Sequence, residues 1–138
     1  MYLLDTNVVS ELRRPKPHGA VVAWLIGVPN EQLYLSAVTL GELQAGVEIT
    51  REQDPDKAAE IDAWIDRIAE SANVLSMDGA SFRAWARLMH RRSDTLLEDA
   101  MIAATAAVHN LTVVTRNVRD FKVFGVNTID PFESQRRR

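Results

Sequence analysis

Four acidic side chains, Asp5, Glu42, Asp99 and Asp120, stand where they could do chemistry together. Asp5 ends a short apolar run, Glu42 and Asp99 lie in largely apolar stretches, and Asp120 follows a β-branched run. Several carboxylates in one pocket repel one another, so some must be protonated unless a cation lies between them. The chain has no cysteine and no histidine near these acids. Oxygen donors alone favour Mg²⁺, with Mn²⁺ as a substitute, over zinc.

The reaction that this donor set predicts is phosphodiester hydrolysis. Mg²⁺ is usually held by one or two carboxylates together with substrate phosphate, and it can activate a water and neutralise developing charge. An enzyme that forms an aspartyl-phosphate intermediate would need Asp-x-Asp after the first strand. This chain has Asp5-Thr6-Asn7 there, which argues against such an intermediate. A mechanism with the RNA 2′-hydroxyl as nucleophile would usually want a histidine or lysine acid–base pair in place of an acid cluster.

Short apolar strands alternate with helical patterns along the chain. We expect strands at residues 1–4, 33–36, 73–75, 112–114 and 127–129. We expect helices at residues 6–12, 18–26, 39–49, 54–68, 78–89 and 97–109, with Thr6 capping the first. Strands without polar alternation that alternate with helices predict an α/β fold, a three-layer α/β/α sandwich around a mostly parallel sheet of about four to five strands.

The carboxyl ends of the parallel strands should gather the acids on one rim of the sheet. Asp5 ends the first strand, Glu42 lies about one turn into the helix after the second, and residues 115–120 follow the fourth. Asp99 begins a buried helix whose N-terminus can point at the same rim. Two plainer interpretations stay open from the residues alone: Asp5 as a strand-end turn residue and Asp99 as a helix cap.

The bulk properties predict one soluble domain. The chain has 138 residues, 46% hydrophobic and 25% charged, and no apolar run long enough to cross a membrane. We expect a domain over residues 1–132 followed by a basic, flexible tail at 133–138. The absence of cysteine suits a cytoplasmic protein. Residues 1–80 carry 6 basic and 13 acidic side chains, whereas residues 81–138 carry 10 basic and 6 acidic ones. A locally basic C-terminal half suits an enzyme that binds a polyanion beside an acidic pocket.

Four sequence blocks together resemble the PIN domain, and specifically the VapC-type toxins of bacterial type II toxin–antitoxin pairs. The blocks are Tyr2–Asn7, Ser36–Leu43 with Gly46-Val47, Asp99–Ala106 and Val114–Phe121. The resemblance extends from Met1 to about Phe132. Four such blocks in order, at the right separations, are a specific signal.

The resemblance implies roles for individual residues. Asp5, Glu42 and Asp99 match the family's three metal-binding acids, and Thr115 matches a hydroxyl that supports the site. The fourth position falls on Asp120 or Asn117, and we favour Asp120 as an accessory metal ligand. Further accessory contacts are expected from Asn7, Asn117 and Arg116.

The resemblance also implies an activity and partners. It predicts an Mg²⁺-dependent ribonuclease that acts on tRNA, rRNA or mRNA, forms a homodimer and is inhibited by a VapB-like antitoxin whose C-terminal segment occupies the site. The rival interpretation is a catalytically weak RNA- or antitoxin-binding module of the same fold. Such a module could lose the acids, and their presence here favours an enzyme.

Overall fold

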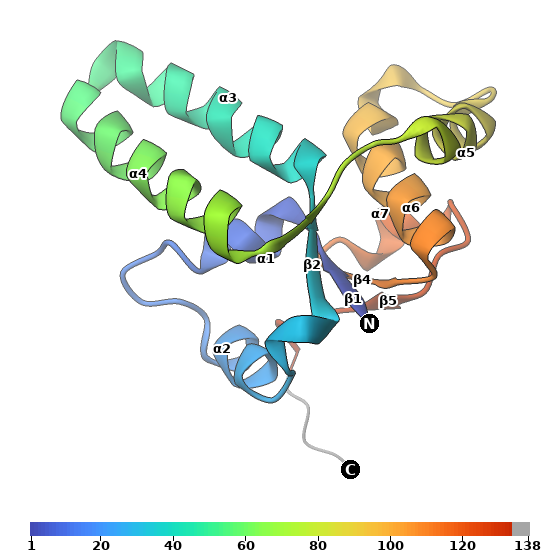
Figure 1. The fold of residues 1–138 in the computed structure, drawn as a ribbon, viewed down its shortest axis with the longest axis horizontal. Helices are drawn as coiled ribbons and strands as arrows, with labels where there is room; N and C mark the ends of the chain where they lie inside the picture. The colour runs from blue at the N-terminus through green and yellow to red at the C-terminus, as the bar shows by residue number, and fades with distance from the viewer. Residues whose placement is uncertain (134–138) are drawn as a thin grey trace.

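The computed structural model describes residues 1–133 and contains one parallel sheet with helices on both sides (Figure 1). The strands are β1 (Tyr2–Leu4), β2 (Leu33–Ser36), β3 (Asn73–Leu75), β4 (Thr112–Val114) and β5 (Thr128–Ile129). The α-helices are α1 (Thr6–Glu11), α2 (Gly19–Ile26), α3 (Ala37–Gln53), α4 (Pro55–Ser71), α5 (Gly79–Met89), α6 (Leu97–His109) and α7 (Val118–Lys122). Two 3₁₀ turns, η1 (Asn30–Gln32) and η2 (Asp94–Leu96), complete these elements. The expected three-layer α/β sandwich is confirmed.

The sheet has the strand order β3-β2-β1-β4-β5, and every neighbouring pair is parallel. In the central strand β1, Leu4 pairs with Leu35 of β2 and with Val114 of β4. The backbone N–H of Asp5 then donates to the Val114 carbonyl at 2.9 Å. This register brings the carboxyl ends of β1, β2 and β4 to the same edge.

Alternate residues of the short strands face two separate cores. Leu3 and Val113 pack with the alanine-rich face of α6 and with Phe121 of α7. Leu4 and Val114 pack on the other side against α1 and α2, including Val21. Because successive strand residues point to opposite faces, both faces must be covered, and the continuous apolar character of the strands follows.

Three local details differ from expectation. Asp5, not Thr6, is the residue that caps α1, and it accepts a hydrogen bond from the backbone N–H of Thr6. The third helix begins at Ala37 behind a Ser36 cap, two residues before the expected start at Thr39. Helix α7 had no counterpart in the expected elements, since five residues are too short for a 3.6-residue periodicity to show.

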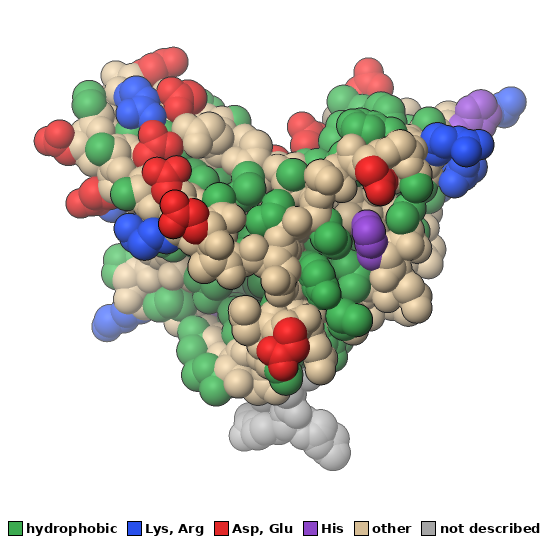
Figure 2. Space-filling view, in the orientation of Figure 1, with side chains coloured by type: hydrophobic (Ala, Val, Ile, Leu, Met, Phe, Trp, Pro, Cys, Tyr) green, Lys and Arg blue, Asp and Glu red, His purple; other side chains and the backbone are tan. Residues whose placement is uncertain are grey.

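Two pairs of helices rise from the sheet on either side of a notch. Helices α3 and α4 pack along each other as one arm, and α5 packs along α6 as the other (Figure 1). The space-filling view shows the notch between the arms, with acidic side chains gathered on the α3–α4 arm (Figure 2).

Within residues 1–133, no helix is long and apolar enough to cross a membrane. Apart from Glu133, the predicted tail at 133–138 lies outside the described residues.

Candidate active site

Asp5 is the most deeply buried acid of the site, with 4% of its surface exposed. Its two carboxylate oxygens each accept a hydrogen bond: Oδ1 from the Thr6 backbone N–H and Oδ2 from the Thr115 hydroxyl, both at 2.8 Å. Burial raises the pKa of Asp5, as do the charges of Glu42 and Asp120, while the two hydrogen bonds partly offset that rise. Asp5 is therefore both a helix cap and an acid held near other acids.

Thr115 joins the end of β4 to the end of β1. Its buried hydroxyl donates to Asp5 Oδ2 and accepts from the Asn117 backbone N–H at 2.9 Å and from Asn7 Nδ2 at 3.5 Å. One donated and two accepted bonds use the full capacity of a hydroxyl. Asn7 Oδ1 in turn accepts from the Arg116 backbone N–H at 3.4 Å. Thr115 thus fixes the orientation of Asp5 and of the loop that follows β4.

Glu42 reaches the same rim from α3 and is held there by a threonine. The Thr6 hydroxyl donates to Glu42 Oε1 at 2.6 Å, and the Thr39 hydroxyl lies 3.0 Å from that of Thr6. Since Thr6 has one proton and gives it to Glu42, Thr39 is the donor to Thr6. Burial raises the pKa of Glu42, and the charges of Glu98 and Asp99 raise it further.

Asp99 differs from Asp5 and Glu42, whose carboxylates each accept a hydrogen bond from a side chain. It is the third residue of α6, whose cap position is Leu96, and no side chain caps that helix. The helix-cap interpretation of Asp99 is therefore wrong. Its carboxylate is partly buried, and no hydrogen bond to it occurs among residues 1–133. Burial, with the charges of Asp5, Asp120 and Glu98, raises its pKa to about 6.

The structure brings together the acids that the sequence singled out, with Glu98 as an addition. Asp120 is exposed on α7, yet its charge raises the pKa of both Asp5 and Asp99. Asn117, the alternative for the fourth position, contributes a backbone bond to Thr115. Thr6 and Thr39 were missed, although Thr6 directly follows Asp5 and Thr39 lies one helical turn before Glu42.

The donor set fits a hard divalent cation by its chemistry. It consists of carboxylate oxygens, and Asp99 lacks any other partner in the described chain. Among residues 1–133, however, no three acidic or histidine side chains are placed so as to hold a metal ion together. The acids are close enough to raise one another's pKa, but their side chains do not close a coordination shell. A bound cation would have to draw them together, and their metal-binding role stays a prediction.

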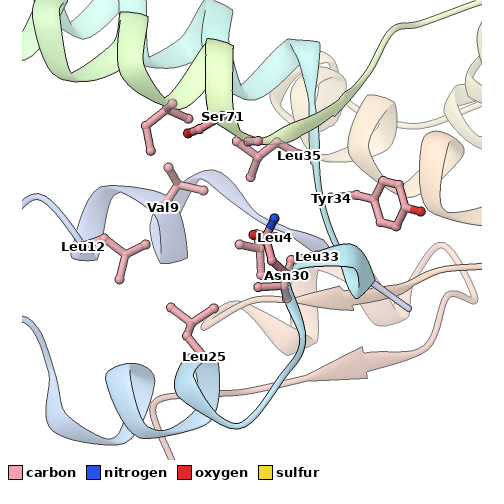
Figure 3. Close-up of a pocket in the computed structure, with 11 residues that line it drawn as sticks. Leu4, Val9, Leu12, Leu25, Asn30, Leu33, Tyr34, Leu35 and Ser71 are labelled. Carbon is pink, nitrogen blue, oxygen red and sulfur yellow. The ribbon is translucent and has the colours of Figure 1, made fainter.

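A separate apolar hollow of about 390 Å³ is lined in part by residues of β1 and β2. Val9 of α1 and Leu25 of α2 contribute to its lining, together with residues of β2 and α4 (Figure 3). The lining contains no acidic, basic or histidine side chain. None of the acids of the site lines this hollow, so it is distinct from the acid cluster.

The parallel sheet and the acids at its strand ends are accompanied by a sequence match to a known family. The chain matches the PIN domain family over residues 2–126 and belongs to it. It is 36% identical to the plasmid stability protein StbB of Pseudomonas syringae pv. tomato, covering 97% of this chain and 100% of the relative. It is also 36% identical to VapC ribonuclease Y4jK of Sinorhizobium fredii, covering 96% and 99%. The crystal structure of FitAcB from Neisseria gonorrhoeae superposes with a TM-score of 0.78 at 34% identity, covering 96% and 99%. The chain is thus consistent with a VapC-type PIN protein, as its sequence predicted.

Proposed function

We propose that this protein is the ribonuclease toxin of a type II toxin–antitoxin pair and hydrolyses RNA phosphodiester bonds with Mg²⁺. The observation that carries the proposal is the convergence of Asp5, Glu42 and Asp99 from three elements, each with its pKa raised by burial and by the other acids. Relatives named VapC ribonuclease and toxin FitB support the same activity.

In this proposal Asp5, Glu42 and Asp99 hold the cation, and Asp120 is an accessory ligand. A bound Mg²⁺, or Mn²⁺ in its place, would lower the pKa of a water and stabilise charge on the phosphoryl oxygens. Thr115 and Thr6 orient the carboxylates of Asp5 and Glu42. Asn7, Asn117 and Arg116 lie beside them, and the proposal gives these three residues accessory contacts.

The charge of the site also makes the cation a condition of RNA binding. Five carboxylates, those of Asp5, Glu42, Glu98, Asp99 and Asp120, act on one another electrostatically. Without a cation they would repel the phosphates of an RNA strand. Metal is therefore expected to affect affinity for RNA as well as the rate of cleavage.

The proposed partners are a VapB-like antitoxin and a second copy of the chain, in the cytoplasm. A similar chain, 31% identical, occurs in a structure described as FitAB bound to an IR36 DNA fragment. An antitoxin arginine would suit the acid cluster, since a planar guanidinium pairs well with carboxylates.

The test is cleavage of a mixed RNA pool by the purified chain in Mg²⁺, Mn²⁺ or EDTA, with the product ends mapped. We expect metal-dependent cleavage that leaves 5′-phosphate and 3′-hydroxyl ends. Asp5→Asn should abolish it, whereas Asp66→Asn, an equal charge change on exposed α4, should not. Cyclic phosphate ends or full activity in EDTA would contradict the metal mechanism. Absence of cleavage under every metal condition would favour the RNA- or antitoxin-binding module.

A further inference from the structure

A polar hollow of about 630 Å³ opens beside the acid cluster, between α7 and the end of β5. This volume lies within the range of ordinary ligand pockets, about 300–1,000 Å³. Arg116, Arg119 and Lys122 contribute to its lining, and so does Asp120. Because the charge of Asp120 also acts on Asp5 and Asp99, the hollow adjoins the proposed cleavage site.

The three cations of the hollow have no acidic partner among the described residues. Within residues 1–133, none of Arg116, Arg119 and Lys122 forms an ion pair, whereas Arg14, Arg51 and Lys57 each do. Arg119 and Lys122 are three residues apart on α7, which places them on neighbouring parts of one helix surface. Their side chains are exposed. Three unpaired cations around one hollow attract an anion.

Arg116 is held in place before any ligand arrives. Its guanidinium carbon lies 4.1 Å from the centre of the Phe132 ring, and its backbone N–H donates to Asn7 Oδ1. Phe132 is itself packed edge-on against His18, with ring centres 5.3 Å apart. Stacking covers one face of a guanidinium and leaves its edge N–H groups free to donate, which is the geometry that suits phosphate.

We propose that this hollow, which we call the α7 hollow and define by Arg116, Arg119 and Lys122, binds one phosphodiester of the substrate RNA next to the bond that is cut. The inference rests on the proposed nuclease function and adds to it a substrate-binding subsite. The loop 115–117 links the two, because Thr115 bonds to Asp5 and accepts from the Asn117 backbone N–H.

Acidic side chains also contribute to the lining of the hollow. Asp130 and Glu133 contribute to it as well as Asp120. Arg119 and Lys122 lie on α7 and Arg116 lies two residues before that helix, so the three cations come from one short segment of the chain. The subsite therefore positions the strand and adds one electrostatic contact to the affinity for RNA.

The experiment measures binding of a fluorescent single-stranded RNA of mixed sequence by anisotropy, in Mg²⁺ and over a range of salt. All variants carry Asp5→Asn so that the probe stays intact. Arg119→Gln/Lys122→Gln should raise Kd roughly tenfold and reduce the salt slope by roughly 0.7, the value for one phosphate of a single strand. The change Arg119→Lys, which keeps the charge, should restore most of the affinity when Lys122 is intact.

The matched control is Arg67→Gln/Arg83→Gln, which removes two exposed cations from α4 and α5. It should leave Kd and the salt slope close to those of the background chain. Equal losses from both double variants, or no loss from the α7 pair, would overturn the subsite. If the α7 pair alone loses affinity while the chain with Asp5 intact cleaves no RNA, the subsite stands and the nuclease proposal fails. Thermal unfolding of each variant confirms that the fold is retained.

Discussion

The Thr115 hydroxyl lies 2.8 Å from Asp5 Oδ2, so a residue at the end of β4 holds the carboxylate at the end of β1. The two residues are 110 positions apart in sequence. Their contact depends on the register of β1 and β4, in which Leu4 pairs with Val114. The sheet thus sets the orientation of the most deeply buried acid of the proposed site.

Thr115→Val is expected to destabilise the fold and impair the site. Valine has a similar shape but leaves Asp5 Oδ2 without its donor and the Asn117 N–H without its acceptor. A buried polar group without its partner costs about 1–3 kcal/mol, which urea unfolding would measure. The pKa of Asp5 should rise further, shifting the acid limb of the cleavage pH profile upward. Thr115→Ser should restore both properties, and an unchanged profile in Thr115→Val would contradict this role.

Thr6→Val is expected to weaken metal binding and, because it also removes the acceptor of the buried Thr39 hydroxyl, to lower the stability of the fold. The Thr6 hydroxyl is the hydrogen bond that holds Glu42 Oε1. Loss of a group that orients a metal ligand typically costs roughly 10- to 100-fold in metal affinity. Calorimetric titration with Mn²⁺ would measure it, and Thr6→Ser is the control that keeps the hydroxyl. Equal Mn²⁺ affinity in Thr6→Val and the parent chain would contradict the role of Thr6 in orienting Glu42.

Asp99 should make the metal-free protein less stable as pH rises. Its folded-state pKa of about 6 lies above its ordinary value of 3.8, so the folded state binds the proton more tightly than the unfolded state. The contribution of Asp99 to the free energy of unfolding should therefore fall as pH rises from about 4 to about 6. Asp99 is partly exposed, so we expect a loss of roughly 1–2 kcal/mol after screening is allowed for.

Asp99→Asn tests this penalty directly. In EDTA at pH 7 the variant should be more stable than the parent chain to urea, while losing RNA cleavage. Asp66→Asn on α4 should change neither property. If the difference in stability between Asp99→Asn and the parent chain in EDTA does not grow between pH 4 and pH 6, Asp99 ionises without a cost to the fold.

Added Mg²⁺ or Mn²⁺ should stabilise the parent chain. A ligand that binds only the folded state adds about 2.7 kcal/mol at 100 times its dissociation constant. Thermal unfolding with and without metal would measure the shift in Tm. The shift should be largely lost in Asp5→Asn and in Asp99→Asn. Because this readout needs no RNA, it separates a failure of metal binding from a failure of cleavage.

The sequence predicted the sheet well because each strand is a short apolar or β-branched run between turn signals. It also predicted that Asp5, Glu42 and the segment after β4 share a rim, since parallel strands end together. Helix α7 was missed because its five residues show no periodicity. The hydrogen bonds that run from Thr39 to Thr6 and from Thr6 to Glu42 were missed because they depend on how α1 packs against α3.

The site draws on residues from both ends of the chain, from Asp5 to Asp120, and this has a consequence during synthesis. Asp5 and Glu42 are synthesised early, whereas Thr115 and the residues of α7 are synthesised only after those of β4. Since a domain of this kind folds as a unit, an incomplete nascent chain lacks the contacts that orient its acids. We therefore expect the proposed nuclease activity to appear only after the residues of α7 have been synthesised.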